Sequence, residues 1–214
     1  MAETTTTRNP EATRKRILSA ALSEFAAKGI SGARVDRIAE RSKSNKRMLY
    51  HYFGSKAGLF KAVLHQRLGG GAPNLAEVDI DESERMARLF ERLWSSPDYL
   101  RLLMWEALER GPRGPIESED IRRANLQVRI DAIREAQAAG RVDTSLDPEM
   151  LVLAELAVTA YPLLFPQVTR LVTGMAGNDP EFRARYLTFL QALGATFGAR
   201  SVARDRSGEV AADG

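Results

Sequence analysis

The chain has 214 residues, of which 44% are hydrophobic, so it can bury the core of one large or two small domains. It contains no cysteine, which excludes a disulfide framework and a thiolate metal site. No run of eighteen apolar residues occurs, and the N-terminal segment lacks the apolar stretch of a secretory signal. We therefore expect a cytoplasmic protein without a membrane partner.

The net charge of +3 is unevenly distributed along the chain. Residues 1–70 hold 14 Lys and Arg against 5 Asp and Glu, a net charge of +9, whereas the remaining residues carry −6. A basic segment attached to a mildly acidic one favours a polyanionic partner such as nucleic acid at one end. An uneven scatter of solvated cations is the alternative.

The first predicted helix follows a polar, Thr-rich segment, residues 1–8, which we expect to be a mobile tail. Asn9 can cap this helix, and Pro10 fits its first turn. Ile17, Ala21 and Phe25 recur at four-residue steps, and Gly29 is expected to end the helix.

Two short helices come next. The first lies in "RVDRIAERS", the polar segment "SKSN" follows, and the second runs from Lys46 to Phe53 with Leu49 and Phe53 on one side. Gly54 ends it, and Ser55 can cap a further helix in "KAGLFKAVLHQRL".

Two short helices joined by a tight turn, with a longer helix before them, predict a helix-turn-helix. The second short helix would direct Lys46, Arg47, Tyr50 and His51 outward, and these residue types suit phosphates and base edges. Lys56 begins the following helix, whose N-terminus could hold a phosphate. Ordinary core or interface packing is the alternative for the aromatic residues.

The segment "GGGAPN", residues 69–74, predicts a domain boundary. We expect domains at residues 9–70 and 75–200 and a second mobile tail at 201–214. Beyond the boundary the pattern stays helical, so the fold class is all-α. Helices are predicted near residues 82–95, 98–110, 118–139, 148–173 and 180–199.

The last two predicted helices favour a dimer. Residues 148–173 are apolar on nearly all sides, and residues 180–199 carry one apolar stripe, so we expect a four-helix bundle with their symmetry mates. Packing within one chain is the alternative. Pro162 and Pro166 predict a kink near Tyr161. The candidate interface residues are Leu163, Val168, Tyr186, Phe189, Leu190, Leu193 and Phe197.

A ligand pocket in the second domain is suggested by large apolar residues and by one carboxylate, Glu155, on an apolar helix. Simple core packing is the alternative for each of them. The candidate pocket residues are Trp94, Tyr99, Met104, Trp105, Glu155, Tyr161 and Phe165. With two histidines in the chain, we expect no catalytic triad, no metal site, no cofactor and no enzyme activity.

Residues 14–64 resemble the DNA-binding region of the tetracycline-repressor (TetR) family of bacterial transcriptional regulators. The resemblance rests on "AALSEFAAKG", "VDRIAERS", "LYHYF" and "SKAGLF" at matching spacings. It implies a three-helix, homeodomain-like helix-turn-helix domain followed by a helical ligand-binding and dimerisation domain. It also implies a homodimer that binds a palindromic operator in double-stranded DNA, represses, and is released by a small-molecule effector.

The resemblance assigns roles residue by residue. Tyr50 and Lys56 match phosphate-binding positions, and Arg34 matches another frequent phosphate contact. The variable positions that read bases or contact phosphates are matched by Asn45, Lys46, Arg47 and His51. This chain departs from the family pattern at Ala33 and Arg34, where Thr or Ser is usual, and at Lys43 and Ser44, where Gly and an apolar residue are usual.

A left-handed turn at Lys43 would cost about 1 kcal/mol relative to glycine.

Two other function classes remain open from the sequence. A ligand-independent architectural DNA-binding protein would hardly distinguish an operator from random DNA. A helical enzyme is disfavoured because no nucleophile, base and orienting group are recognisable together.

Overall fold

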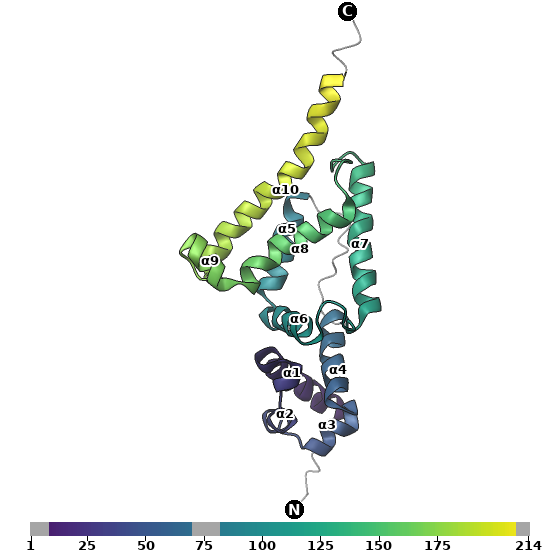
Figure 1. Cartoon of the computed structure of the whole chain (residues 1–214), viewed down its shortest axis with the longest axis vertical. Helices are drawn as coiled ribbons and strands as arrows, with labels where there is room; N and C mark the ends of the chain where they lie inside the picture. Colours follow the sequence, from purple (N-terminus) through teal and green to yellow (C-terminus); the bar gives the residue numbers. More distant parts are fainter. Residues whose placement is uncertain (1–8, 70–81, 209–214) are drawn as a thin grey trace, which may run out of the picture. The chain divides into compact units, whose positions relative to one another are not determined.

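The computed structural model describes residues 9–69 and 82–208, with side chains for residues 9–67 and 83–196. Every regular element in this part is an α-helix, which confirms the all-α prediction (Figure 1). The predicted tail at 1–8 and residues 209–214 of the tail predicted at 201–214 lie outside the described residues, whereas residues 201–208 are a correction, because α10 continues through them. The helices are α1 (Pro10–Gly32), α2 (Val35–Arg41), α3 (Lys46–Phe53), α4 (Lys56–Gly69), α5 (Glu82–Trp94), α6 (Pro97–Arg110), α7 (Glu119–Ala138), α8 (Pro148–Leu164), α9 (Pro166–Thr173) and α10 (Pro180–Gly208).

The chain forms two compact units, one with residues 1–71 and 101–119, the other with residues 72–100 and 120–214. Unlike the contiguous division expected at 9–70 and 75–200, residues 101–119 group with the N-terminal helices. Leu102 is fully buried in the core of that first unit. Arg101 Nε and Trp105 Nε1 both donate to the carbonyl oxygen of Ala26, at 2.9 and 3.2 Å. From Arg101 onward, α6 is thus fastened to the C-terminal part of α1.

The core of the first unit is built from all four N-terminal helices. Phe25 of α1 and Phe60 of α4 meet edge to face, with ring centroids 5.2 Å apart. Ile38 of α2 and Leu49 of α3 are buried in the same cluster. Phe53, also predicted to anchor α3, is half-buried and lies under the guanidinium of Arg14. The apolar side of α3 is therefore turned inward as the four-residue spacing predicted.

A buried carboxylate sets the start of α2. Glu24 of α1 is 3% exposed, and its Oε1 accepts a hydrogen bond from the backbone N–H of Arg34 at 3.1 Å. Arg37 Nη1 lies 3.8 Å from the same oxygen. Because a buried carboxylate is stable only when it is paired, these contacts hold α2 against α1.

The turn between α2 and α3 is a Schellman motif. The N–H of Ser44 donates to the carbonyl of Ala39, and the N–H of Lys43 donates to that of Glu40, at 2.9 and 3.0 Å. Lys43 has φ 51°, so it adopts the left-handed conformation that its position in this motif requires. Lys43 stands where glycine is usual, so its backbone is strained as expected.

Gly29 ends the regular part of α1, as expected, with φ 70° and ψ −178°. This conformation is accessible to glycine alone. A Cβ at Gly29 would lie 2.3 Å from Glu109 Oε1 and 2.7 Å from Trp105 Cε3. Both carboxylate oxygens of Glu109 accept the backbone N–H of Ser31 at 3.1 Å. Glycine thus permits the close approach of α6 within the first unit.

In the second unit, α5 packs against both α8 and α10 (Figure 1). One side of α5 buries Met86 and Phe90 with Phe182 and Leu190 of α10. The other side buries Leu89 and Leu93 beside α8. A third cluster joins α7 to the start of α8 through Ile133, Ala136, Leu151 and Val152.

The predicted kink near Tyr161 lies instead at Phe165, where the chain turns by 87° from α8 to α9. Pro166 disfavours a helical conformation at the residue before it, so Phe165 has φ −121° and ψ 63°. Pro162 stays inside α8 although it lacks an N–H. The hydroxyl of Tyr186 on α10 donates to the carbonyl oxygen of Val158 at 2.8 Å, which replaces the missing donor.

Replacing Lys43 by glycine should stabilise the first unit by about 1 kcal/mol, because glycine adopts the left-handed conformation without steric cost. We expect the melting temperature to rise by about 2–4 °C in a thermal scan. Lys43→Ala is the matched control, since alanine keeps the strain and removes only the charge. An equal effect of both substitutions would contradict the strain argument.

Candidate functional site

The outer side of α3 carries most of the predicted DNA-contacting residues. Asn45, Lys46, Arg47, Tyr50 and His51 are all exposed, and Tyr50 has 42% of its surface accessible. Asn45 also caps the helix, because its Oδ1 accepts the N–H of Met48 at 2.8 Å. The exposed face therefore combines cations, a phenol, an imidazole and an amide, which are groups that bind phosphates and base edges.

Lys46 is already paired with a carboxylate. Its Nζ lies 3.0 Å from Asp36 Oδ1 on α2. The hydrogen bond to Asp36, and then its negative charge, raise the pKa of Lys46. The ammonium is therefore protonated at neutral pH. A DNA phosphate would have to share or displace the Asp36 carboxylate to bind it.

Lys56 and Arg34 lie beside the connection between α1 and α2. Lys56 Nζ donates to the carbonyl oxygens of Ser31 and Ala33, at 3.1 and 3.0 Å. These bonds fasten the start of α4 to the segment before α2. The side chain of Arg34 is exposed while its backbone N–H binds Glu24. Phosphate contacts by both residues stay a prediction.

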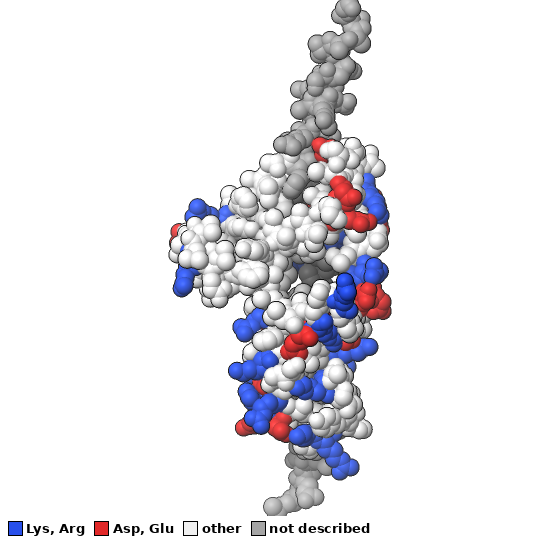
Figure 2. Space-filling model, in the orientation of Figure 1, with Lys and Arg blue, Asp and Glu red and all other residues white. Residues whose placement is uncertain are grey.

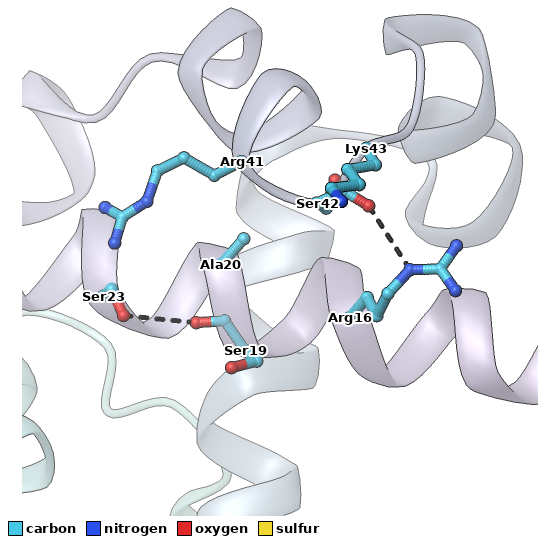
Figure 3. Close-up of a pocket in the computed structure, with 7 residues that line it drawn as sticks. All are labelled: Arg16, Ser19, Ala20, Ser23, Arg41, Ser42 and Lys43. Carbon is cyan, nitrogen blue, oxygen red and sulfur yellow. Dashed lines mark hydrogen bonds between the residues drawn. The ribbon is translucent and has the colours of Figure 1, made fainter.

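Basic side chains extend from α3 over the surface of the first unit (Figure 2). A polar hollow of about 380 Å³ lies beside the turn, lined by Arg16, Arg41 and Lys43 together with serines of α1 (Figure 3). The Nε of Arg16 donates to the carbonyl of Ser42 at 3.4 Å and ties α1 to the turn (Figure 3). The surface around the turn is thus positively charged, as nucleic-acid binding requires.

The candidate pocket residues are not gathered into one cluster. Met104 and Trp105 belong to the first unit, whereas Trp94 packs on Phe90 in the second. The rings of Tyr161 and Phe165 contact each other in a tilted arrangement, and 50% and 43% of the two residues' surfaces are exposed. Tyr99 is half-buried near the start of α6.

Glu155 alone among these candidates forms a buried charged site. It is 6% exposed and binds Arg129 of α7. Sequence reasoning identified the carboxylate but not its arginine partner, because the spacing of charges along one helix does not reveal the helix that faces it.

The predicted interface residues fall into three groups. Val168 and Phe189 are exposed, with 36% and 51% of their surfaces accessible. Leu163, Tyr186 and Leu193 are half-buried against the core of the second unit, and the side chain of Phe197 lies outside the described residues. Leu190 is a correction, because it is fully buried inside its own chain.

The sequence pattern missed several large apolar residues that are exposed on α8 and α9. They share a high exposed fraction, up to 83% at Leu171, and Figure 2 shows a surface over these helices with few charges. Because the sequence of α8 and α9 is apolar on nearly all sides, it does not show which side faces outward. The additional residues are Met150, Leu153, Leu171 and Val172.

No single helix among the described residues is long and apolar enough to cross a membrane. In the part of the chain that the structure describes, only α8 and α9 taken together reach that length and hydropathy, and they are bent by 87°. Within the same described part, no three His, Asp or Glu side chains are arranged to hold a metal ion.

Two family models match the chain. Residues 17–63 match the model described as "Bacterial regulatory proteins, tetR family". Residues 81–191 match the model described as "Tetracyclin repressor-like, C-terminal domain". Together these matches include α2, α3 and most helices of the second unit.

Individual relatives agree with the family models. The chain is 36% identical over 176 residues to the HTH-type transcriptional repressor SCO4008 of Streptomyces coelicolor, covering 80% of this chain and 90% of that protein. It is 31% identical over 179 residues to the regulator RutR of Escherichia coli, covering 80% and 83%. The crystal structure of SCO4942 from Streptomyces coelicolor superposes with a TM-score of 0.68 at 28% identity, covering 85% of this chain and 97% of that one.

Replacing Asp36 by asparagine should strengthen binding to random-sequence DNA several-fold. The substitution removes a carboxylate 3.0 Å from Lys46 and leaves the ammonium available to a phosphate. The slope of log affinity against log salt should steepen by about 1. Fluorescence anisotropy over a salt series measures both quantities.

Glu84→Gln is the matched control, because it breaks a similar exposed pair with Arg88 in the second unit. This variant should bind DNA as the unmodified protein does. Equal affinities and salt slopes for Asp36→Asn and the unmodified protein would argue against a DNA-facing Lys46.

Proposed function

Because the chain belongs to the TetR family of DNA-binding transcriptional regulators, we propose that it is a homodimeric repressor released from a palindromic operator by a small-molecule effector. The observation that carries the proposal is the exposed, basic outer side of α3. Lys46, Arg47 and Tyr50 project from a helix whose other side is buried. Such a helix fits the major groove with its N-terminal residues toward the bases.

Arg47 and Lys46 are the proposed base-reading residues, because long cationic side chains near the helix start can reach guanine O6 and N7. Tyr50 and Lys56 are proposed to hold phosphates. Lys56 also supports the segment before α2, so part of its contribution would be the orientation of Arg34. In a dimer, the two copies of α3 would enter successive major grooves about 34 Å apart.

The proposed dimer interface lies on α8, α9 and α10. Leu153 and Tyr161 are eight residues apart on α8, and 59% and 50% of their surfaces are exposed. Phe189 of α10 is 51% exposed. Burial of large apolar side chains contributes about 1.5–3 kcal/mol each, so a few such residues can support a dimer. This exposed apolar surface supports an intermolecular role over packing within one chain.

Effector release requires a ligand that binds two conformations of the dimer with different affinities. Helix α6 is suited to transmit such a difference, because Leu100 packs with Leu89 and Leu93 of the second unit while Leu102 is buried in the first. We propose that movement of α6 changes the spacing of the two α3 helices.

We place the protein in the cytoplasm, where bacterial operators are found. We infer no enzyme activity, since the relatives are regulators. A ligand-independent architectural protein is the second candidate, and the basic surface alone would serve it equally well. Sequence preference separates the two functions.

Binding to DNA that flanks the protein's own gene should be at least about 10³-fold tighter than binding to random DNA at physiological salt. Arg47→Ala should cost about 1–3 kcal/mol and relax the preference at one base pair of each half-site. Tyr50→Ala should weaken binding to all sequences alike. Footprinting locates the operator, and anisotropy titrations measure the affinities.

Lys28→Ala, an exposed position on α1 outside the predicted contacts, serves as the control and should leave the affinities unchanged. Similar affinities for the flanking DNA and random DNA would support the architectural alternative.

Replacing Leu153 by glutamate should weaken the dimer at least about tenfold, because the substitution would bury an unpaired charge in the interface. Sedimentation velocity over a concentration series measures the dissociation constant. Leu108→Glu is the control, since Leu108 on α6 is 73% exposed and lies outside the proposed interface. A Leu153→Glu variant that remains as dimeric as the unmodified protein would refute this interface.

A further inference from the structure

We propose that Arg129 is the centre of a binding site for a carboxylate group in the second unit, and that the effector is a carboxylic acid with an apolar body. This inference rests on the proposed regulation by a small molecule. It adds the chemical class of the ligand and the residue that binds it.

Arg129 is buried where three helices meet. The residue lies on α7 and is 4% exposed. Its Nη2 donates to Glu155 Oε2 on α8 at 2.6 Å. The other oxygen of Glu155 lies 3.7 Å from Arg85 Nη1 on α5. One carboxylate therefore interacts with two guanidinium groups from different helices.

The second terminal nitrogen of Arg129 has no hydrogen-bond partner among the described residues. Nη1 is buried and makes no hydrogen bond, although it carries two N–H donors. A buried charged donor without an acceptor is costly, so a site of this kind is built to receive an acceptor. Glu155 binds Arg129 through Nη2 alone, which leaves the Nη1 end of the guanidinium to another group.

A carboxylate is the group that matches this end. Arginine offers donors and no acceptor, so the ligand must accept hydrogen bonds, and an ionised acceptor binds a guanidinium more strongly than a neutral one. A cationic ligand would be repelled by Arg129 and Arg85. Among anions, both carboxylates and phosphates suit a guanidinium, and the singly charged carboxylate costs less to bury.

The surroundings indicate an apolar body for the ligand. Leu126 and Ile133 are three residues before and four residues after Arg129 on α7, so they share its side of the helix. Both belong to the apolar cluster that joins α7 to Leu151 and Val152 of α8. A carboxylate bound to Arg129 would therefore carry an aliphatic or aromatic group into contact with these side chains.

The test compares matched acids and amides on the full-length dimer. Benzoate with benzamide and hexanoate with hexanamide are the probes, and inorganic phosphate tests whether any anion suffices. Isothermal titration calorimetry measures binding without DNA, and anisotropy measures operator affinity separately. We expect an acid to bind at least about tenfold more tightly than its amide. Absence of binding by both acids, equal binding of acid and amide, or a preference for phosphate would overturn the inference.

Two variants give opposite results if the inference is right. Arg129→Met should abolish binding of the acid, whereas Glu155→Gln should increase its affinity because the negative charge beside the site, which repels an anionic ligand, is gone. Arg134→Met is the matched control, because Arg134 lies on the same helix in an exposed pair with Asp131 and should not affect binding. If Arg129→Met does not fold, Glu155→Gln still decides, since unchanged or weaker binding there would contradict the proposal.

The two readouts separate this inference from the proposed function. An acid that binds through Arg129 without changing operator affinity would support the carboxylate site and refute release by such an effector. Release of the operator by the amides alone would support effector regulation and refute the carboxylate site.

Discussion

The DNA-facing surface depends on the burial of one side of a very short helix. A helix of the length of α3, Lys46–Phe53, is unstable in water by itself. It is held because Leu49 is buried among residues of α1, α2 and α4. Because that side is buried, the side chains on the opposite side of α3, those of Lys46, Arg47 and Tyr50, lie on the outer surface. The exposed cluster is thus a consequence of the packing inside the first unit.

Local signals allowed much of this unit to be predicted from the sequence. Asn45 and Gly54 determine both ends of α3, because a side-chain cap and a positive φ are properties of single residues and their neighbours. The left-handed turn at Lys43 could be expected for the same reason. The bonds of Lys56 to Ser31 and Ala33 could not, because they join segments distant in sequence.

The second unit was less predictable because its helices are apolar on more than one side. Periodicity does not show which apolar side chains of α8 and α10 pack within their own chain, so the pattern predicts an interface role for Leu190 of α10, which is fully buried, and misses the exposed Leu153 of α8. The pairing of Glu155 with Arg129 likewise depends on which face α7 presents to α8. Such information comes from tertiary packing rather than local pattern.

The hydrogen bond from Tyr186 to the carbonyl of Val158 also fixes how α10 can slide along α8. A shift of one helical turn would leave the carbonyl above Pro162 without a donor in a half-buried position, so a single register is favoured. Two helices locked in this way form a preassembled half of the proposed four-helix bundle. The two protomers would then associate through surfaces that are already ordered, so little conformational entropy would be lost when the dimer forms.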